Sequence, residues 1–207
     1  NDITKVTWLT AVYYYDDKNR SIQVQTENFK GGKDIATARY NFVGAVVCSY
    51  TVHNNPAAAI TNLTTQTNYN YDHAGRLLNI SKKINDDNNT KRTLVEYTYD
   101  KMGQAKTKRL GQKRNTDGTL STQPLDILEC DYNIRGWLTG INANFTKTAT
   151  DNSKYFGMQL HYDWGFQNSL YNGTIAGTQW KTKGSGAKRA YGLGYDNTNQ
   201  LLFADFN

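Results

Sequence analysis

The chain has 207 residues, of which 38% are hydrophobic and 13% aromatic, so it carries more apolar material than a disordered chain and enough for a folded protein. Its formal net charge of +6 comes from lysines and arginines scattered along the sequence, which fits a solvated sheet face better than a nucleic-acid-binding surface. No stretch approaches the ~18 consecutive apolar residues of a membrane-spanning helix, so we expect no membrane span. Abundant Tyr, Thr, Asn and Gly predict many strands joined by tight turns.

Taken in chain order, a short motif recurs in which Tyr precedes Asp or Asn and a Gly or Asn stands four residues after the Tyr. Tyr162-Asp163 is a degenerate further copy, with Gly165 displaced by one position. Recurrence every 25 to 33 residues is typical of stacked supersecondary units. The six regular copies are Tyr15-Asp16 with Asn19, Tyr40-Asn41 with Gly44, Tyr71-Asp72 with Gly75, Tyr99-Asp100 with Gly103, Tyr132-Asn133 with Gly136, and Tyr195-Asp196 with Asn199.

Each copy predicts a β-hairpin with a loop of three to four residues. Residues 95–99 alternate as a strand does, and residues 76–80 leave the motif in the same fashion. The Asp or Asn starts the turn by accepting backbone hydrogen bonds, and the Gly or Asn takes a positive φ. Longer connections, such as residues 85–89 and 115–118, carry the chain to the next hairpin, and we expect no helix beyond a single turn. The predicted fold class is all-β, with stacked β-hairpin repeats forming a twisted, curved antiparallel sheet.

The recurring residues are expected to be structural. The tyrosines should form an aromatic ladder in the core, with each hydroxyl bonded to a neighbouring backbone carbonyl or a repeat Asp. The glycines should serve the turns. The positions concerned are Tyr15, Tyr40, Tyr71, Tyr99, Tyr132 and Tyr195, with Gly44, Gly75, Gly103 and Gly136.

Catalytic and metal sites find little support in the residues. His73 lies in a repeat turn, where other copies carry unrelated residues. The repeat carboxylates could form a glycosidase pair, but Asn41 and Asn133 replace them in two copies, which a turn acceptor survives and a catalytic acid does not. The run 86–89 is interpreted as a hairpin tip, because it lacks the Gly and the distal Glu of a calcium loop. We therefore expect a non-enzymatic protein without cofactor, metal or catalytic residue.

The tryptophans are the best candidates for a role beyond architecture, because exposed aromatic rings stack on sugars. Trp137 and Trp180 alternate with apolar neighbours and are expected to pack inside the fold. Trp164 stands where the repeat breaks down and is the candidate ligand contact. A module that binds carbohydrate or another surface polymer is thus the alternative function, and a glycan hydrolase is the remote one.

The motif copies resemble the YD repeat of Rhs-type proteins, most closely at residues 71–77, 99–104 and 195–201. Residues 132–139 are similar to the variant found in very large surface proteins of the Bacteroidetes type. The resemblance covers Trp8 to the end, so residues 1–207 are interpreted as one YD-repeat region of about seven repeats from a larger protein. It implies a bacterial, secreted or cell-surface protein in which a β-ribbon coils into a shell around a C-terminal toxin domain. No Asp-Pro self-cleavage motif of the Rhs core is present in this sequence.

The resemblance and the residues together predict a structural repeat scaffold, part of an Rhs-type surface or secreted shell. The expected partners are the rest of the parent chain, a C-terminal toxin domain or a surface glycan, and no nucleic acid. Strand edges left unpaired by the array are expected to cause edge-mediated self-association.

Overall fold

The structure is a computed structural model that describes residues 8–166 and 169–207. The chain divides into two compact units, Asn1–Glu96 and Tyr97–Asn207, and each is described here by itself. The described residues are almost entirely strands and turns, and all strand pairs within each unit are antiparallel. The prediction of an all-β fold of stacked hairpins is therefore confirmed.

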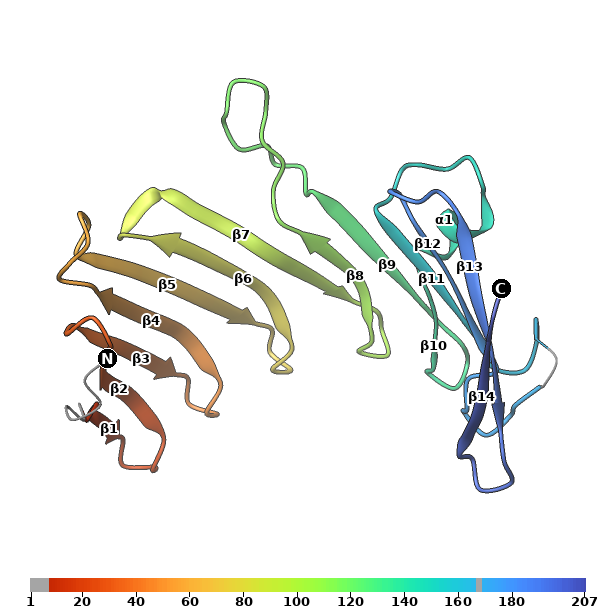
Figure 1. Cartoon of the computed structure of the whole chain (residues 1–207), viewed down its shortest axis with the longest axis horizontal. Helices are drawn as coiled ribbons and strands as arrows, with labels where there is room; N and C mark the ends of the chain where they lie inside the picture. Colours follow the sequence, from red (N-terminus) through yellow and green to blue (C-terminus); the bar gives the residue numbers. More distant parts are fainter. Residues whose placement is uncertain (1–7, 167–168) are drawn as a thin grey trace, which may run out of the picture. The chain divides into compact units, whose positions relative to one another are not determined.

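The first unit is a sheet whose strands lie side by side in chain order (Figure 1). Every connection is a hairpin between sequence neighbours, so no crossover occurs among these strands. The strands are β1 (Ala11–Tyr15), β2 (Ser21–Glu27), β3 (Lys33–Tyr40), β4 (Val46–Asn54), β5 (Asn62–Tyr71), β6 (Leu77–Ile84) and β7 (Asp87–Tyr99), the last of which ends just beyond the unit boundary.

The second unit continues the same pattern and adds a short helix, α1 (Ala143–Lys147), between two of its strands. The sequence predicted no helix longer than one turn, and α1 exceeds this only slightly, since it spans five residues. The strands are β8 (Ala105–Leu110), β9 (Asp126–Tyr132), β10 (Leu138–Ile141), β11 (Phe156–His161), β12 (Gly177–Thr182), β13 (Lys188–Tyr195) and β14 (Leu201–Phe206).

The motif turns share one geometry, which the hairpin at Tyr71 illustrates. The Asp72 amide donates to the carbonyl of Arg76, and the Gly75 amide donates to the carbonyl of Asp72. Gly75 has φ 79°, and this left-handed conformation lets the three-residue loop 73–75 close back onto the outgoing strand. Asn19 fills this position at φ 58°, since Asn tolerates the left-handed region better than other side chains. The predicted loop length and turn positions are confirmed.

The hairpins also share one register. In five of them the motif Tyr pairs with the residue six positions later, and the residue before the Tyr pairs with the one eight positions after it. The residue between is an extra one, so each hairpin carries a β-bulge at the start of its outgoing strand. The bulged residues are Ile22, Val47, Leu78, Thr139 and Leu202.

Stacking of one hairpin on the next follows an equally constant rule. The residue eight after one motif Tyr faces the residue three before the next Tyr, which sets the register between consecutive repeats. The pairs are Gln23 with Thr37, Cys48 with Asn68, Asn79 with Glu96, Thr107 with Glu129, and Gly140 with Gln159. Five consecutive repeat interfaces are thus superimposable in register, although their sequences differ.

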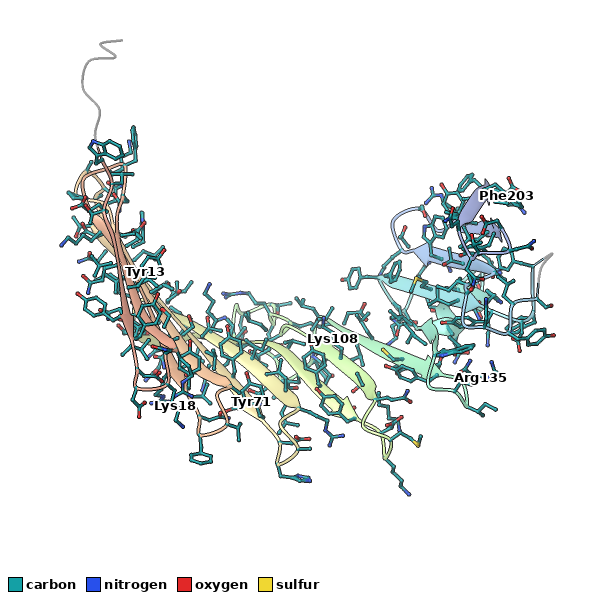
Figure 2. All side chains as sticks on the ribbon, turned by 90° about the horizontal axis from the view of Figure 1, so that it is seen from below. Tyr13, Lys18, Tyr71, Lys108, Arg135 and Phe203 are labelled. Atoms are coloured by element: carbon teal, nitrogen blue, oxygen red, sulfur yellow. The ribbon has the colours of Figure 1, made fainter. Side chains whose placement is uncertain are left out.

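The two units differ in burial. In the described part of the first unit only Gly32, Ser81 and Val95 are buried, so this unit is a single-layered sheet (Figure 2). In the second unit α1 lies on β11 and β12 and provides a second layer. Phe145 of α1 is only 1% exposed, and Thr146 and Lys181 are buried as well. Among the described residues, these side chains between α1 and the sheet form the small core of the second unit.

Candidate functional site: the tyrosine ladder and the edge strands

A ladder of hydrogen bonds joins successive repeats through the motif tyrosines. In four copies the hydroxyl donates to the backbone carbonyl of the residue six positions after the preceding motif Tyr, at the start of the preceding outgoing strand. A backbone carbonyl was one of the two acceptors expected from the sequence. The bonds run from Tyr40 to Ser21 (2.9 Å), Tyr71 to Val46 (2.9 Å), Tyr132 to Ala105 (3.0 Å) and Tyr162 to Leu138 (2.9 Å).

The tyrosine rings are less buried than a core ladder would require. Tyr40, Tyr71, Tyr99, Tyr132 and Tyr195 are half-buried, and Tyr15 on the edge strand is 56% exposed. Tyr162, in the degenerate copy, is the buried member. The expectation of a tyrosine ladder in the core thus fails for the regular copies, whose rings are half-buried or exposed in both units. The rings contribute through hydroxyl bonds and contacts along the sheet rather than through deep burial.

The motif Asp and Asn side chains are committed to their own turns. One side-chain oxygen accepts the amides two and four residues onward in five of the six regular copies, and Asn41 accepts the amide of Ala45. Arg76 further pairs with the Asp72 carboxylate at 2.7 Å. The five with both amide bonds are Asp16, Asp72, Asp100, Asn133 and Asp196.

These bonds favour the charged form of the carboxylates that show a shift. Bonds from the side chain and backbone of Arg20 lower the pKa of Asp16. Bonds from the backbones of Arg76 and Gln200 lower the pKa of Asp72 and Asp196, respectively. A carboxyl held ionised by its own turn is a structural acceptor, and Asn can replace it without loss of the amide bonds.

The positions of the four predicted glycines differ in their surroundings. Gly44 and Gly75 stand in open turns, and Gly103 has φ 83°. Gly136 lies against the preceding motif turn, because its carbonyl accepts a 3.0 Å bond from the Gln104 side chain. The Tyr99 and Tyr132 hairpins therefore contact each other through their turns as well as through their strands.

The degenerate seventh copy keeps the ladder and loses the hairpin. Tyr162 still bonds to Leu138, but the chain then leaves the sheet and returns only at β12. Its return is fixed by the Ala176 amide, which donates to the His161 carbonyl at 2.7 Å. Tyr195 consequently bonds to Ile175 at 3.0 Å, a residue outside the regular ladder position.

Trp164 lies at this break and is 61% exposed. Its ring meets the edge of His161 with 4.4 Å between the ring centroids. His161 is 2% exposed, and its ring nitrogens have no hydrogen-bond partner of good geometry among the described residues. Burial, helped by nearby Lys188 and opposed by the Trp164 backbone, lowers the pKa of His161. Trp164 therefore presents an exposed indole on a buried, neutral imidazole.

The other two tryptophans singled out in the sequence make contacts with neighbouring aromatic rings. Trp137 lies 5.1 Å from the Tyr162 ring, and the Arg135 guanidinium covers it. Trp180 stacks on Tyr191 at 5.5 Å. Both rings are half-buried on the sheet rather than packed inside the fold, so the expectation of interior packing is met only in part.

A buried lysine was not anticipated from the sequence. Lys181 of β12 is 1% exposed and donates to the carbonyls of Thr148, Ala149 and Asp151 at 2.7–2.9 Å. Its ammonium also lies 4.5 Å from the ring centroid of Phe145. The lysine thereby ties the segment after α1 to the sheet. Its three acceptors are backbone groups about thirty residues away, which leave no sequence signature.

The remaining predicted positions are accounted for locally. Of the run 86–89 only Asp86 lies in the two-residue turn between β6 and β7, and residues 87–89 begin β7. Asp86 accepts a 2.6 Å bond from the Tyr50 hydroxyl. His73 lies exposed in its turn. Across residues 8–166 and 169–207, no group of three or more His, Cys, Asp or Glu is placed to hold a metal ion. None of the helical structure in the same residues has the length and apolarity for crossing a bilayer.

The described sheet has two edge strands rich in exposed apolar side chains. On β1 these are Val12, Tyr13, Tyr14 and Tyr15, at 43–56% exposure. On β14 every residue is exposed, including Leu201, Leu202, Phe203 and Phe206 at 47–65%. Among the described residues β1 pairs with β2 alone and β14 with β13 alone, so each presents an open line of backbone groups.

The fold and these contacts define an open array of β-hairpins stacked in chain order. No protein-family model matches the chain, and no curated protein matches it in sequence. Among solved structures it is similar to the Photorhabdus luminescens Tc holotoxin pore, with TM-score 0.51 and 14% identity over 93% of this chain and 10% of that one. A porin-like protein from Bacteroides uniformis aligns at TM-score 0.37 and 15% identity, over 92% of this chain and 60% of that one. The chain thus spans about a tenth of the toxin-complex chain, and the likeness to it shows a shared fold.

Proposed function

We propose that this chain is a non-enzymatic scaffold, a stretch of an Rhs-type surface or secreted shell that in the full-length protein encloses or presents a C-terminal domain. The observation that carries the proposal is that most copies use their motif side chains in the same way. The Asp or Asn closes its own turn, and the Tyr bonds the preceding repeat. Repeats joined by these bonds can be stacked one on the next into a sheet of any length.

The fold likeness to a chain of the Tc holotoxin pore supports the same direction, since 93% of this chain aligns with 10% of that much longer chain. The YD-repeat resemblance of the motif supports a bacterial toxin-type shell and a secreted or surface location. The single-layered first unit also suits a wall, because it exposes both sheet faces.

The scaffold role is tested in the full-length protein that carries this region. Tyr71→Ala combined with Tyr132→Ala removes two ladder bonds and is expected to make the segment after the repeats sensitive to protease. Tyr155→Ala, at an exposed position outside the ladder, is the matched control and should leave protection unchanged. Full protection in the double variant would contradict a shell built by this ladder.

The absence of an enzymatic role is tested on the purified chain. Release of sugars from a panel of bacterial and plant polysaccharides should stay at the level of the buffer blank. Turnover abolished by Asp72→Asn, a change that preserves the turn bonds, would identify a catalytic carboxylate and overturn the proposal.

A second candidate function, binding of a glycan, rests on Trp164. Its indole is 61% exposed and is held edge-on by a buried ring, which is an arrangement that can stack on a sugar. A glycan array is the test, with Trp164→Ala against Trp8→Ala, another exposed Trp, as control. Binding lost in the first variant alone would support it, and the lack of any reproducible signal would remove it.

A further inference from the structure

The second unit holds an open groove on its sheet between the Tyr99 and Tyr132 hairpins. The groove has a volume of about 720 Å³, which is in the range of ligand-binding pockets. The half-buried Tyr99, Cys130 and Tyr132 line it along the strands, and the strongly exposed Met102 and Ile134 line it at the turn tips. The ladder uses the Tyr132 hydroxyl, so the face of the ring is left to line the groove.

Lysine side chains stand beside tyrosine rings on this face of the sheet. Lys106 and Lys108 alternate along β8 and therefore share a face, and the exposed Lys106 lines the groove. The Lys108 ammonium, labelled in Figure 2, lies 5.6 Å from the centroid of the Tyr97 ring, and the Tyr97 and Tyr99 rings stack at 6.4 Å. Lys101, exposed in the Tyr99 turn, adds a third ammonium. The groove thus combines positive charge with aromatic faces.

Most carboxylates of the same strands are directed away from the groove. Glu129 and Asp131 alternate with the groove residues of β9 and point to the opposite face, where the Asp131 carboxylate lies 3.6 Å from the position of a Gly140 Cβ, on the side of α1. Asp126, at the far end of β9, accepts two backbone amides. Asp100 accepts two backbone amides of its own turn. The three lysines therefore outnumber Asp100, and the groove has a net positive charge.

We propose that this groove binds an acidic polysaccharide whose sugar rings carry carboxylates. The apolar face of a sugar ring stacks on Tyr132, and its carboxylate accepts hydrogen bonds from the ammonium groups of Lys106 and Lys108. The groove is separate from Trp164, which does not line it. The proposal goes beyond the scaffold role and does not depend on it.

The backbone around the groove explains why a sugar polymer fits better than a peptide. β8 and β9 are each hydrogen-bonded to a strand on both sides, so neither offers open backbone groups to an added peptide strand. Recognition therefore falls to side chains. A nucleic-acid strand makes many phosphate contacts along a basic track, whereas these lysines stand within a single repeat. A carboxylated sugar needs only a ring face with an ammonium beside it.

Calorimetric titration of the purified chain with oligogalacturonate, oligomannuronate and oligoglucuronate tests the class of ligand. At least one of these should bind at low ionic strength, and added salt should weaken the binding because it screens exposed charges. Maltoheptaose, which has no carboxylate, should bind at least about tenfold more weakly. Failure of all three acidic sugars to bind would overturn the proposal. Equally tight binding of polyglutamate would also overturn it, because the groove would then recognise negative charge alone.

Lysine variants test the place of binding. Lys106→Gln with Lys108→Gln is expected to weaken binding of the acidic sugar about tenfold, since charge-assisted hydrogen bonds are lost. Lys113→Gln with Lys147→Gln is the matched control, because it removes the same charge from exposed positions elsewhere in the unit. Its affinity should stay within about twofold of the wild type. Equal losses in the two double variants would show attraction by net charge and would overturn the proposal.

A pair of variants at Tyr132 tests the stacking. Tyr132→Phe and Tyr132→Leu both lose the hydroxyl bond to Ala105, so the ladder is weakened equally in the two. Tyr132→Phe keeps the ring and should bind the acidic sugar about fivefold more tightly than Tyr132→Leu. Equal affinities would contradict the proposal. The lysine variants, which lie outside the ladder, decide the question if the leucine variant does not fold.

Discussion

The two units of the chain build the same hairpin stack with different support. The first consists of hairpins alone, with three buried residues in its described part, whereas the second inserts α1 and a long loop and buries Phe145, Lys181 and His161. The motif turns and the ladder bonds are nevertheless alike in both. The comparison teaches that the motif alone determines the hairpin and its register. The small core under α1 is a separate feature of the second unit.

The largest expected effect comes from removing the added core. Phe145→Ala should lower the free energy of unfolding by about 3–5 kcal/mol, because the ring is 1% exposed and its removal leaves a cavity beneath Lys181. The loss should be confined to the second unit, as urea denaturation followed by hydrogen exchange would show. Phe42→Ala is the control, since that ring is 90% exposed and its loss should be nearly neutral. An equal loss of protection in the first unit would break the comparison.

A close approach of backbone and helix provides the next effect. A Cβ at Gly157 would lie 2.8 Å from the Asn142 carbonyl oxygen and 2.9 Å from the Phe145 ring. Gly157→Ala should therefore cost about 1–3 kcal/mol through displacement of the helical layer. Gly184→Ala, where a Cβ meets nothing within 4 Å, serves as control in the same unit. Equal thermal midpoints for the two variants would show that α1 is not packed as described.

The ladder bond should have a smaller effect that does not depend on the core. Tyr71→Phe removes a single 2.9 Å bond to Val46 in the first unit and should cost about 0.5–1.5 kcal/mol. Tyr132→Phe, which loses the bond to Ala105 in the second unit, should cost a similar amount. Chemical denaturation of both variants beside Tyr155→Phe measures the difference. A cost seen in one unit alone would mean that the ladder is not a common device.

The sequence was sufficient for features whose partners are near in the chain. Asp72 and Gly75 close their turn within five residues, so residue type alone predicts the hairpin. The helical layer was not predictable, because Lys181 finds backbone acceptors about thirty residues away and α1 is too short for a periodic pattern. The depth of the tyrosines was overestimated for a related reason: burial depends on a second layer, which a repeat motif does not encode. The domain boundaries, the site residues and the partners predicted from the sequence remain predictions.

The stability of the two units should depend differently on pH, and this is the smallest of the predicted effects. Burial lowers the pKa of His161 below its ordinary 6.5, so the unfolded chain takes up a proton first, and the second unit loses stability as pH falls below about 6.5. In the turns the pKa values of Asp16 and Asp72 lie below 3.8, so their stabilisation is lost only as pH falls through that range. Hydrogen exchange between pH 7 and 5 should show the second unit weakening first. His161→Phe should abolish that early loss.

The account depends most on the claim that all regular repeats stack in one register. Cross-strand nuclear Overhauser contacts in the isotope-labelled chain measure it directly. The account predicts the same pairing in each unit, with Cys48 opposite Asn68 in the first and Thr107 opposite Glu129 in the second. A different offset at either interface, even by one residue, would contradict it.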